Sequence, residues 1–146
     1  MGCNNCWCIG KMTECINDKF LNPHFKIFKS IESLVKDFEN LKNNDHIILP
    51  TIRENTKHSF HLFVIRSDKR NELSKYLNEN GIETAVHYPV ALVNMPAYAY
   101  LEIQPSDYPN SIEYQDKILS LPMYPELTEE QITYVSNKIN FFFKSI

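Results

Sequence analysis

The feature that most constrains the fold is a strand, a helix and a second strand in immediate succession near the middle of the chain. Ser59–Arg66 is a run of alternating, mostly apolar side chains, which predicts a strand buried on both faces. Lys69–Asn80 has apolar residues at helical spacing, with Asp68 as the expected cap and Gly81 after its end. Glu83–His87 again alternates with the period of a strand. The pattern predicts a compact α/β unit in which the two strands pair in one small sheet.

A second amphipathic helix is predicted from Glu129 to Phe143. Thr128 can cap its first turn, and Gln131 stands where a capping box requires Glu or Gln. Its apolar stripe has helical spacing and consists of Ile132, Val135, Ile139 and Phe142. We expect both helices to pack on one face of a small mixed or antiparallel sheet.

Shorter elements are expected in the rest of the chain. A helix with an apolar stripe is predicted from Ser30, and another short helix within Ala91–Leu101, where Pro96 would interrupt or begin it. A further helix is expected from Asp107 to about Lys117. Leu119–Leu121 reads as a brief extended segment, ended by a proline.

The composition is that of an ordinary globular chain with one domain. Of its 146 residues, 43% are hydrophobic and 23% are charged, and the formal net charge of -3 gives no electrostatic footprint for nucleic acid. No apolar run approaches the roughly 20 residues that span a bilayer, and the N-terminus lacks the layout of a signal peptide. We therefore expect a cytoplasmic protein whose partners include neither nucleic acid nor membrane.

Four cysteines, Cys3, Cys6, Cys8 and Cys15, lie close together near the N-terminus. Their CxxCxC pattern could hold zinc or act in redox chemistry, but no second ligand pair follows at finger spacing and no strand precedes it. We expect residues 1–29 to form a poorly ordered leader with incidental thiols and no bound metal. Residues 30–146 are expected to form the folded domain.

Three segments together resemble the C-terminal part of the DegT/DnrJ/EryC1/StrS family of sugar aminotransferases. They are HSFHLFVIRSDKRNELSKYLNENGIETAVHYPV at 58–90, the NMPAY that follows, and ILSLPMYPELTEEQITYVSNKI at 118–139. The resemblance implies the α+β-type small domain of the aspartate aminotransferase fold. It also implies an enzyme that uses pyridoxal phosphate to aminate a keto-sugar carried on a nucleotide.

The resemblance further implies that the large, cofactor-binding domain of such an enzyme is absent from this sequence. In the family that domain supplies the Schiff-base lysine, whereas Lys11, Lys19, Lys26 and Lys29 match no such motif. We therefore expect no catalytic, cofactor-binding or metal-binding residue, no pyridoxal phosphate on this chain alone, and no activity without a partner. The expected partners are a large aminotransferase domain or a second copy in a homodimer, and a nucleotide-linked sugar only within a complete enzyme.

His87 and Tyr88 are the candidate substrate-binding residues. They match the HYP segment of the family, which is expected near the bound sugar nucleotide, although Val93 stands where the family usually has a second histidine. Without the resemblance, His87 reads as a strand-end histidine with its ring bonded to backbone, and with it the two readings are evenly balanced. His58 and His61 lack a third metal ligand at suitable spacing, so structural roles are expected for them. Two functions remain open: part of an enzyme, or a non-catalytic remnant or interaction module with the small-domain fold.

Overall fold

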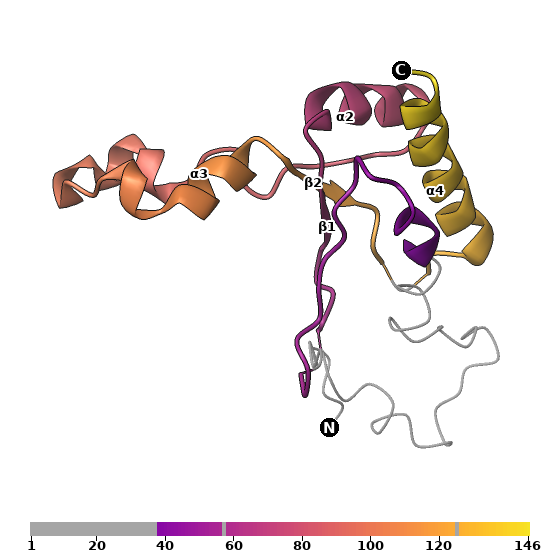
Figure 1. Cartoon of the computed structure of the whole chain (residues 1–146), viewed down its shortest axis with the longest axis horizontal. Helices are drawn as coiled ribbons and strands as arrows, with labels where there is room; N and C mark the ends of the chain where they lie inside the picture. Colours follow the sequence, from indigo (N-terminus) through magenta and orange to yellow (C-terminus); the bar gives the residue numbers. More distant parts are fainter. Residues whose placement is uncertain (1–37, 57, 125) are drawn as a thin grey trace, which may run out of the picture.

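The computed structural model describes residues 38–56, 58–124 and 126–146, which form a small body and a protruding arm (Figure 1). The body contains a two-stranded sheet and the helices α2 (Arg70–Glu79) and α4 (Glu129–Lys144). The predicted leader 1–29 lies outside the described residues, as does the beginning of the helix expected from Ser30. The described end of that segment is a short 3-10 helix, η1 (Phe38–Leu41).

The sheet is built on strands β1 (Phe63–Arg66) and β2 (Ile118–Leu121), which pair in antiparallel register. Ile48 forms an isolated bridge with Arg66 at the outer side of β1, and Ala85 forms one with Ser120 at the outer side of β2. The expected α/β architecture with a small antiparallel sheet is therefore confirmed.

The predicted strand Ser59–Arg66 is too long at its beginning. Phe60 has a positive φ of 46°, and its N–H donates to Nδ1 of His58 at 2.8 Å rather than to a neighbouring strand. Regular pairing begins only at Phe63. Within β1, Phe63 and Ile65 are buried, whereas Val64 is only partly covered. The strand is thus buried on one face and partly buried on the other, close to the expectation of a strand buried on both faces or nearly so.

The predicted pairing of β1 with Glu83–His87 was also wrong, because β2 lies between them. Only Ala85 has backbone bonds to the sheet, with its N–H and carbonyl 3.2 and 2.8 Å from the backbone of Ser120. The N–H of Thr84 donates instead to the side chain of Asn78. The segment predicted to be merely extended, around Leu119, is thus one of the two strands of the sheet.

The two main helices match their predicted spans to within a residue at each end. α4 begins with the full capping box, in which Thr128 and Gln131 exchange side-chain to backbone bonds. α2 does not use Asp68 as its cap. Lys69 occupies the N-cap position and its N–H donates to Oγ of Ser67, while Asp68 pairs with another residue described below.

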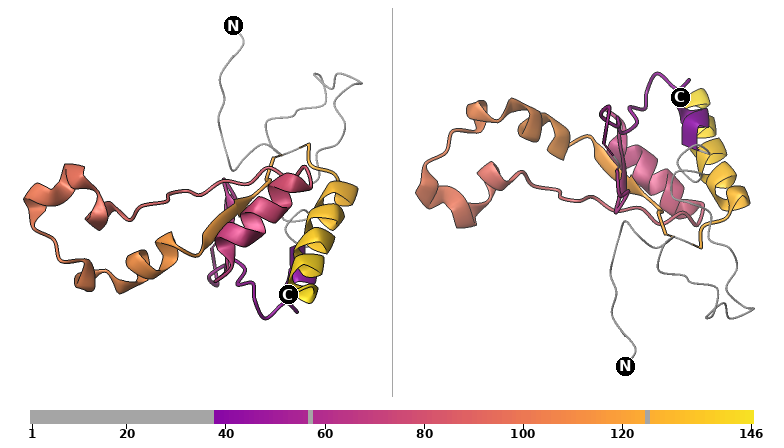
Figure 2. Two further views of the ribbon diagram at one scale, coloured as in Figure 1. Left: turned by 90° about the horizontal axis from the view of Figure 1, so that it is seen from above. Right: turned by 90° about the horizontal axis from the view of Figure 1, so that it is seen from below.

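The core lies between the sheet and these helices, which pack against each other on the same side of the strands (Figure 2). The predicted stripe of α4 is buried along its length, with Ile132 and Ile139 fully inaccessible. Leu73 and Leu77 provide the equivalent stripe of α2. The two amphipathic patterns therefore determine which face of the sheet is covered.

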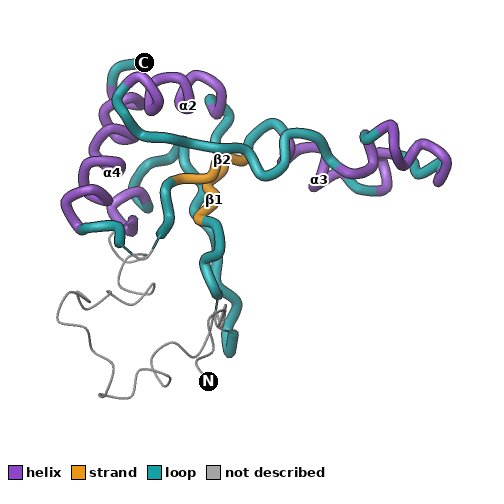
Figure 3. Tube along the Cα trace, turned by 180° about the vertical axis from the view of Figure 1, so that it is seen from behind, coloured by secondary structure: helices purple, strands orange, loops and turns teal. Residues whose placement is uncertain are grey.

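Residues 88–116 form the arm, which leads away from the helices and returns to β2 (Figures 1 and 3). It contains the 3-10 helices η2 (Leu92–Asn94), η3 (Pro96–Leu101) and η4 (Pro105–Asp107), followed by helix α3 (Pro109–Gln115). The short helices predicted here are confirmed in position. In the described ranges, no helix has the length and apolar character needed to cross a membrane.

Candidate functional site

His87 lies where the chain leaves the sheet and enters the arm. Its Nδ1 is 2.9 Å from Oγ of Ser120, a buried residue of β2. The backbone of Ser120 is itself fixed, because it pairs with Val64 on one side and Ala85 on the other. The imidazole is exposed, and within the described ranges its Nε2 has no hydrogen-bond partner. The sheet therefore holds one ring nitrogen and leaves the other available.

The bond to Ser120 links the protonation of the two ring nitrogens. If the Ser120 hydroxyl donates to Nδ1, the neutral ring carries its proton on Nε2 and can donate to a ligand. If Nδ1 donates to Ser120, a neutral ring presents Nε2 as an acceptor. Nε2 can thus donate to a carbonyl or phosphate oxygen in the first case and accept from a hydroxyl in the second.

Tyr88 lies directly beside this ring. The two ring centroids are 6.0 Å apart in an edge-on arrangement, and the peptide bond between the residues is cis. The Tyr88 side chain is 77% exposed. The two residues predicted from the sequence thus form one accessible pair at the base of the arm.

An open groove of about 700 Å³ borders His87, between the segment 82–87, the end of β2 and the first turns of α4. Leu121 and Val135 contribute apolar surface to it, while Thr84 and Gln131 add polar groups. Ligand sites commonly measure roughly 300–1,000 Å³ and combine apolar walls with a few polar groups. The groove has this size and composition, but it is open rather than enclosed.

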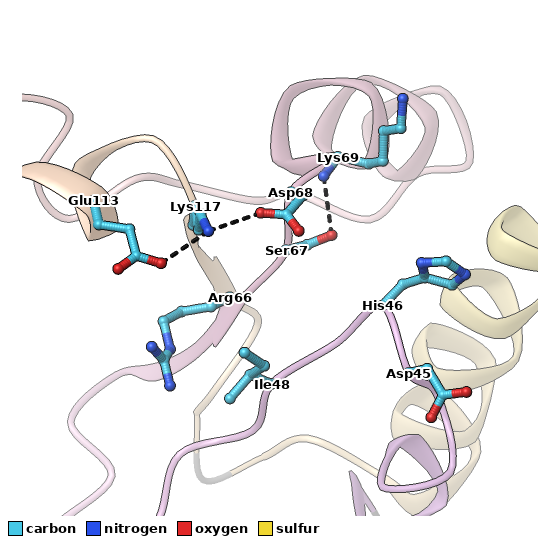
Figure 4. A pocket seen from close by; sticks show the side chains of 9 residues that line it. All are labelled: Asp45, His46, Ile48, Arg66, Ser67, Asp68, Lys69, Glu113 and Lys117. Carbon is cyan, nitrogen blue, oxygen red and sulfur yellow. Dashed lines mark hydrogen bonds and ion pairs between the residues drawn. The ribbon is translucent and has the colours of Figure 1, made fainter. Parts of the chain in front are cut away.

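A second hollow of about 110 Å³ lies on the other side of the sheet's end, near the base of the arm (Figure 4). Lys117 lines this hollow, and its Nζ lies 2.9 Å from a carboxylate oxygen of Glu113 and 2.9 Å from one of Asp68. Hydrogen bonds to Glu113 and then to Asp68 raise the pKa of Lys117 above its ordinary value. Arg66 beside it stacks its guanidinium on the ring of Tyr114 at 4.2 Å. The charged side chains of the hollow are therefore paired with one another, and Lys117 links α3 to the segment that precedes α2. We interpret the hollow as a structural ion-pair cluster rather than a substrate pocket.

The sequence predicted neither the ion-pair cluster around Lys117 nor the contact of Ser120 with His87. The i, i+4 spacing of Glu113 and Lys117 was a usable signal for the first. The contact of Ser120 with His87 spans 33 residues of sequence. No local signal could have shown that contact.

The described lysines do not fit the Schiff-base position of pyridoxal phosphate. That position needs a lysine whose pKa is lowered by burial or charge, whereas the pKa of Lys117 is raised. Nζ of Lys138 is held at 2.7 Å by the side chain of Asn80. The other lysines with described side chains are exposed: Lys42, Lys69, Lys75 and Lys144.

No group of three metal-ligating side chains occurs within the ranges that the structure describes. The ring of His58 lies tilted against that of Phe60, with centroids 4.2 Å apart, in keeping with the structural role expected for it. His61 is exposed. The cysteine segment lies outside the described residues.

The fold resembles part of the solved structures of sugar aminotransferases. The crystal structure of Streptomyces venezuelae DesV in complex with a ketimine intermediate aligns with a TM-score of 0.75 and 29% identity, over 80% of this chain and 32% of that one. An aminotransferase from Brucella abortus aligns with a TM-score of 0.70 and 26% identity, over 77% of this chain and 30% of that one.

Residues 28–140 match the DegT/DnrJ/EryC1/StrS aminotransferase family, and the chain belongs to it. It is 40% identical over 100 residues to a pleiotropic regulatory protein of Geobacillus stearothermophilus, covering 68% of this chain. It is 34% identical over 102 residues to the dTDP-3-amino-3,6-dideoxy-alpha-D-galactopyranose transaminase of Aneurinibacillus thermoaerophilus, covering 70% of this chain. The matched region spans 27% of each of these relatives.

Proposed function

We propose that this chain is the small-domain part of a pyridoxal-phosphate-dependent aminotransferase that acts on a keto-sugar carried on a nucleotide. Family membership over residues 28–140 supports the reaction class. The name of the Aneurinibacillus relative supports a nucleotide-linked sugar as the substrate class. We further propose that the chain alone is inactive, because its described lysines do not fit the cofactor's Schiff base.

The observation that carries the proposal is the way the sheet presents His87. Ser120 fixes Nδ1, so Nε2 faces outward beside the exposed ring of Tyr88. A fixed imidazole and a phenol can hydrogen-bond sugar hydroxyls or phosphate oxygens, and the flat faces of both rings can cover a sugar or a base. We assign these residues to binding and orienting the substrate, not to the bond-breaking steps.

Pyridoxal phosphate supplies an electron sink for amino transfer when it is bound to a complete enzyme. We assign its binding to a large domain supplied by a partner. The groove beside His87 would then be closed by that domain, which would exclude water from the reacting groups.

A second candidate function is a non-catalytic interaction module. Val93 favours it, because the family usually has a histidine at this position, so a polar contact to the substrate is missing here. Val93 lies within η2, only a few residues from the His87–Tyr88 pair. Both an enzyme part and an interaction module would bind a partner protein, but only the enzyme part would bind the sugar nucleotide. Binding of the sugar nucleotide therefore distinguishes the two functions.

The test combines the full chain with the part of the Aneurinibacillus transaminase that lies outside its matched region. Purified separately, the chain should transfer no amino group in the presence of pyridoxal phosphate. With the complementary piece, amino transfer to a dTDP-linked keto-sugar should appear, with the cofactor trapped by borohydride on a lysine of that piece. Trapping on one lysine of this chain alone would overturn the proposal.

The matched variants are His87→Ala and His61→Ala, since both histidines are exposed and lie near the ends of sheet segments. His87→Ala should raise KM for the sugar nucleotide by about tenfold, the loss of one hydrogen bond to a charged or polar group. The affinity for pyridoxal phosphate should change less. His61→Ala should change neither. Equal effects of the two variants, or an assembled complex that never binds sugar nucleotide, would favour the interaction module.

A further inference from the structure

The peptide bond between Asn80 and Gly81 joins the end of α2 to the segment that leads to the sheet. It is the only asparagine–glycine pair in the sequence. Asparagine is a chemically labile residue, and a following glycine increases the lability because it has no Cβ to shield its backbone nitrogen. Asn80 is partly buried and Gly81 is exposed, so water can reach the pair. The pair is therefore a candidate site for deamidation.

Deamidation here is a reaction between two neighbouring groups of the chain. The Gly81 nitrogen gives its proton to solvent and forms a bond to Cγ of Asn80. The bond from Cγ to Nδ2 breaks, and ammonia leaves with a proton. Water then opens the cyclic imide at either of its carbonyls, which gives aspartate or the isoaspartyl isomer. One water is consumed and one ammonia is released, with no change of oxidation state.

The folded chain holds both reacting groups away from this reaction. The Gly81 N–H donates to the carbonyl of Asn78 at 3.0 Å. In the side chain of Asn80, Nδ2 donates to the carbonyl of Tyr76 at 2.8 Å, and Oδ1 accepts from Nζ of Lys138 at 2.7 Å. With ψ of Asn80 at 16°, the Gly81 nitrogen is also turned away from Cβ of Asn80. Ring closure therefore requires both the side chain and the backbone of Asn80 to rotate.

Two of the groups that oppose this rotation come from α4. Lys138 holds Oδ1 of Asn80, and the hydroxyl of Tyr134 donates to the backbone carbonyl of Asn80 at 3.1 Å. Nζ of Lys138 also lies 5.4 Å from the centre of the Tyr134 ring, so the two side chains lie together over the end of α2. A change of ψ moves the carbonyl of Asn80 and breaks the bond from Tyr134. The packing of α4 on α2 thus opposes ring closure.

We propose that Asn80 is a deamidation site that α4 keeps unreactive, so that the site reacts when α4 separates from α2. The two products have different effects on the turn. Aspartate keeps an acceptor for Lys138, whereas the isoaspartyl product adds a methylene to the main chain at the end of α2. That insertion displaces the next bond of the turn, from the N–H of Ile82 to the carbonyl of Leu77 at 2.9 Å. The modification therefore acts on the start of the segment that ends at His87.

The experiment follows Asn80 by peptide mass spectrometry while the full chain is incubated at mildly alkaline pH. The chain unfolded in urea gives the unprotected rate, and the folded chain should react more slowly by roughly tenfold or more. Lys138→Met removes the donor to Oδ1 and should speed the reaction of the folded chain by about tenfold, the effect of losing one charged hydrogen bond. Lys144→Met is the matched control, because Lys144 is an exposed lysine in the last turn of the same helix. It should leave the rate unchanged.

Urea unfolding of the same variants separates local opening from global unfolding. A rate that rises in Lys138→Met only by the factor by which its unfolding constant rises would overturn the inference, because global unfolding would then control the reaction. Equal rates in the folded and unfolded chain would also overturn it, as would equal rates in Lys138→Met and Lys144→Met. If Lys138→Met does not fold, Tyr134→Phe takes its place, since it removes only the hydroxyl bonded to Asn80. It should likewise raise the rate by more than its unfolding constant.

Discussion

Ser120 on β2 holds Nδ1 of His87 at 2.9 Å, across 33 residues of sequence. The serine is buried and the histidine is exposed, so a rigid part of the core orients a side chain at the surface. A ligand-binding group positioned in this way loses little conformational entropy when a ligand arrives.

Replacing Ser120 by alanine should therefore release the His87 ring. We expect the free energy of unfolding to fall by about 1 kcal/mol, the value of one partly buried hydrogen bond. Ser136→Ala is the matched control, because Ser136 is also buried but its Oγ has no hydrogen-bond partner in the described ranges. It should change stability by less than about 0.5 kcal/mol. Urea unfolding measures both variants.

Nitrogen NMR of the imidazole then separates orientation from stability. In Ser120→Ala, the populations of the Nδ1–H and Nε2–H forms of His87 should change, because the hydroxyl bonded to Nδ1 is gone. In Ser136→Ala they should stay as in the unmodified chain. Identical spectra for both variants would show that Ser120 does not determine the state of His87.

The stripe of α4 provides a stability test. Ile139→Asp places a charge without a partner at a fully buried position and should lower the free energy of unfolding by more than about 3 kcal/mol. Phe141→Asp, two residues further along the same helix, replaces a side chain that is 63% exposed and should change it by less than about 0.5 kcal/mol. Thermal and urea unfolding measure the loss of stability in each of the two variants. Similar losses in both would mean that the stripe is not what anchors α4.

Some parts of this fold could be predicted because their signals are local. The span of α4 follows from Thr128 and Gln131, which make both bonds of the capping box. The buried stripe follows from the helical spacing of apolar residues. These features depend on neighbours within one or two turns, so the chain alone contains the information.

Other parts could not be predicted because they depend on distant partners. Glu83–His87 has the alternation of a strand, yet only Ala85 bonds to the sheet, since the neighbouring position is taken by β2. Asp68 has the sequence of a cap, but Lys117, which lies far along the chain, competes for its carboxylate. The identity of His87 and Tyr88 as candidates came from the family resemblance, whereas the contact that orients His87 came only from the structure.

Lys117 should make stability depend on pH in the alkaline range. Its pKa is raised above 10.5 in the folded chain, by hydrogen bonds to Glu113 and Asp68. The protonated form is thus favoured by folding. Its contribution is fully present below pH 10.5 and is lost as the pH rises through the higher pKa of the folded chain.

Lys117→Met should therefore lower stability at neutral pH, and the difference from the unmodified chain should shrink as the pH rises above 10.5 through the raised pKa of Lys117. Lys75→Met is the control, because Lys75 approaches Glu79 only to 4.0 Å and both side chains are largely exposed. It should have a smaller effect at neutral pH. Urea unfolding across this range tests the sign, and a Lys117→Met difference that grows with pH would contradict it.

Gln115 should control how firmly the arm is held at its base. Gln115→Leu keeps a side chain of similar bulk but removes the acceptor that joins Ala91 and Asn94, so the outgoing segment loses its bond to α3. We expect amide hydrogen exchange at Ala91 to rise by about tenfold, as follows from the loss of one hydrogen bond. Gln104→Leu is the matched control, because Gln104 bonds only locally, to the carbonyl of Glu102. Exchange at Ala91 should not respond to it. If Gln115→Leu also leaves exchange at Ala91 unchanged, then the arm is held by Lys117 and its carboxylates rather than by Gln115.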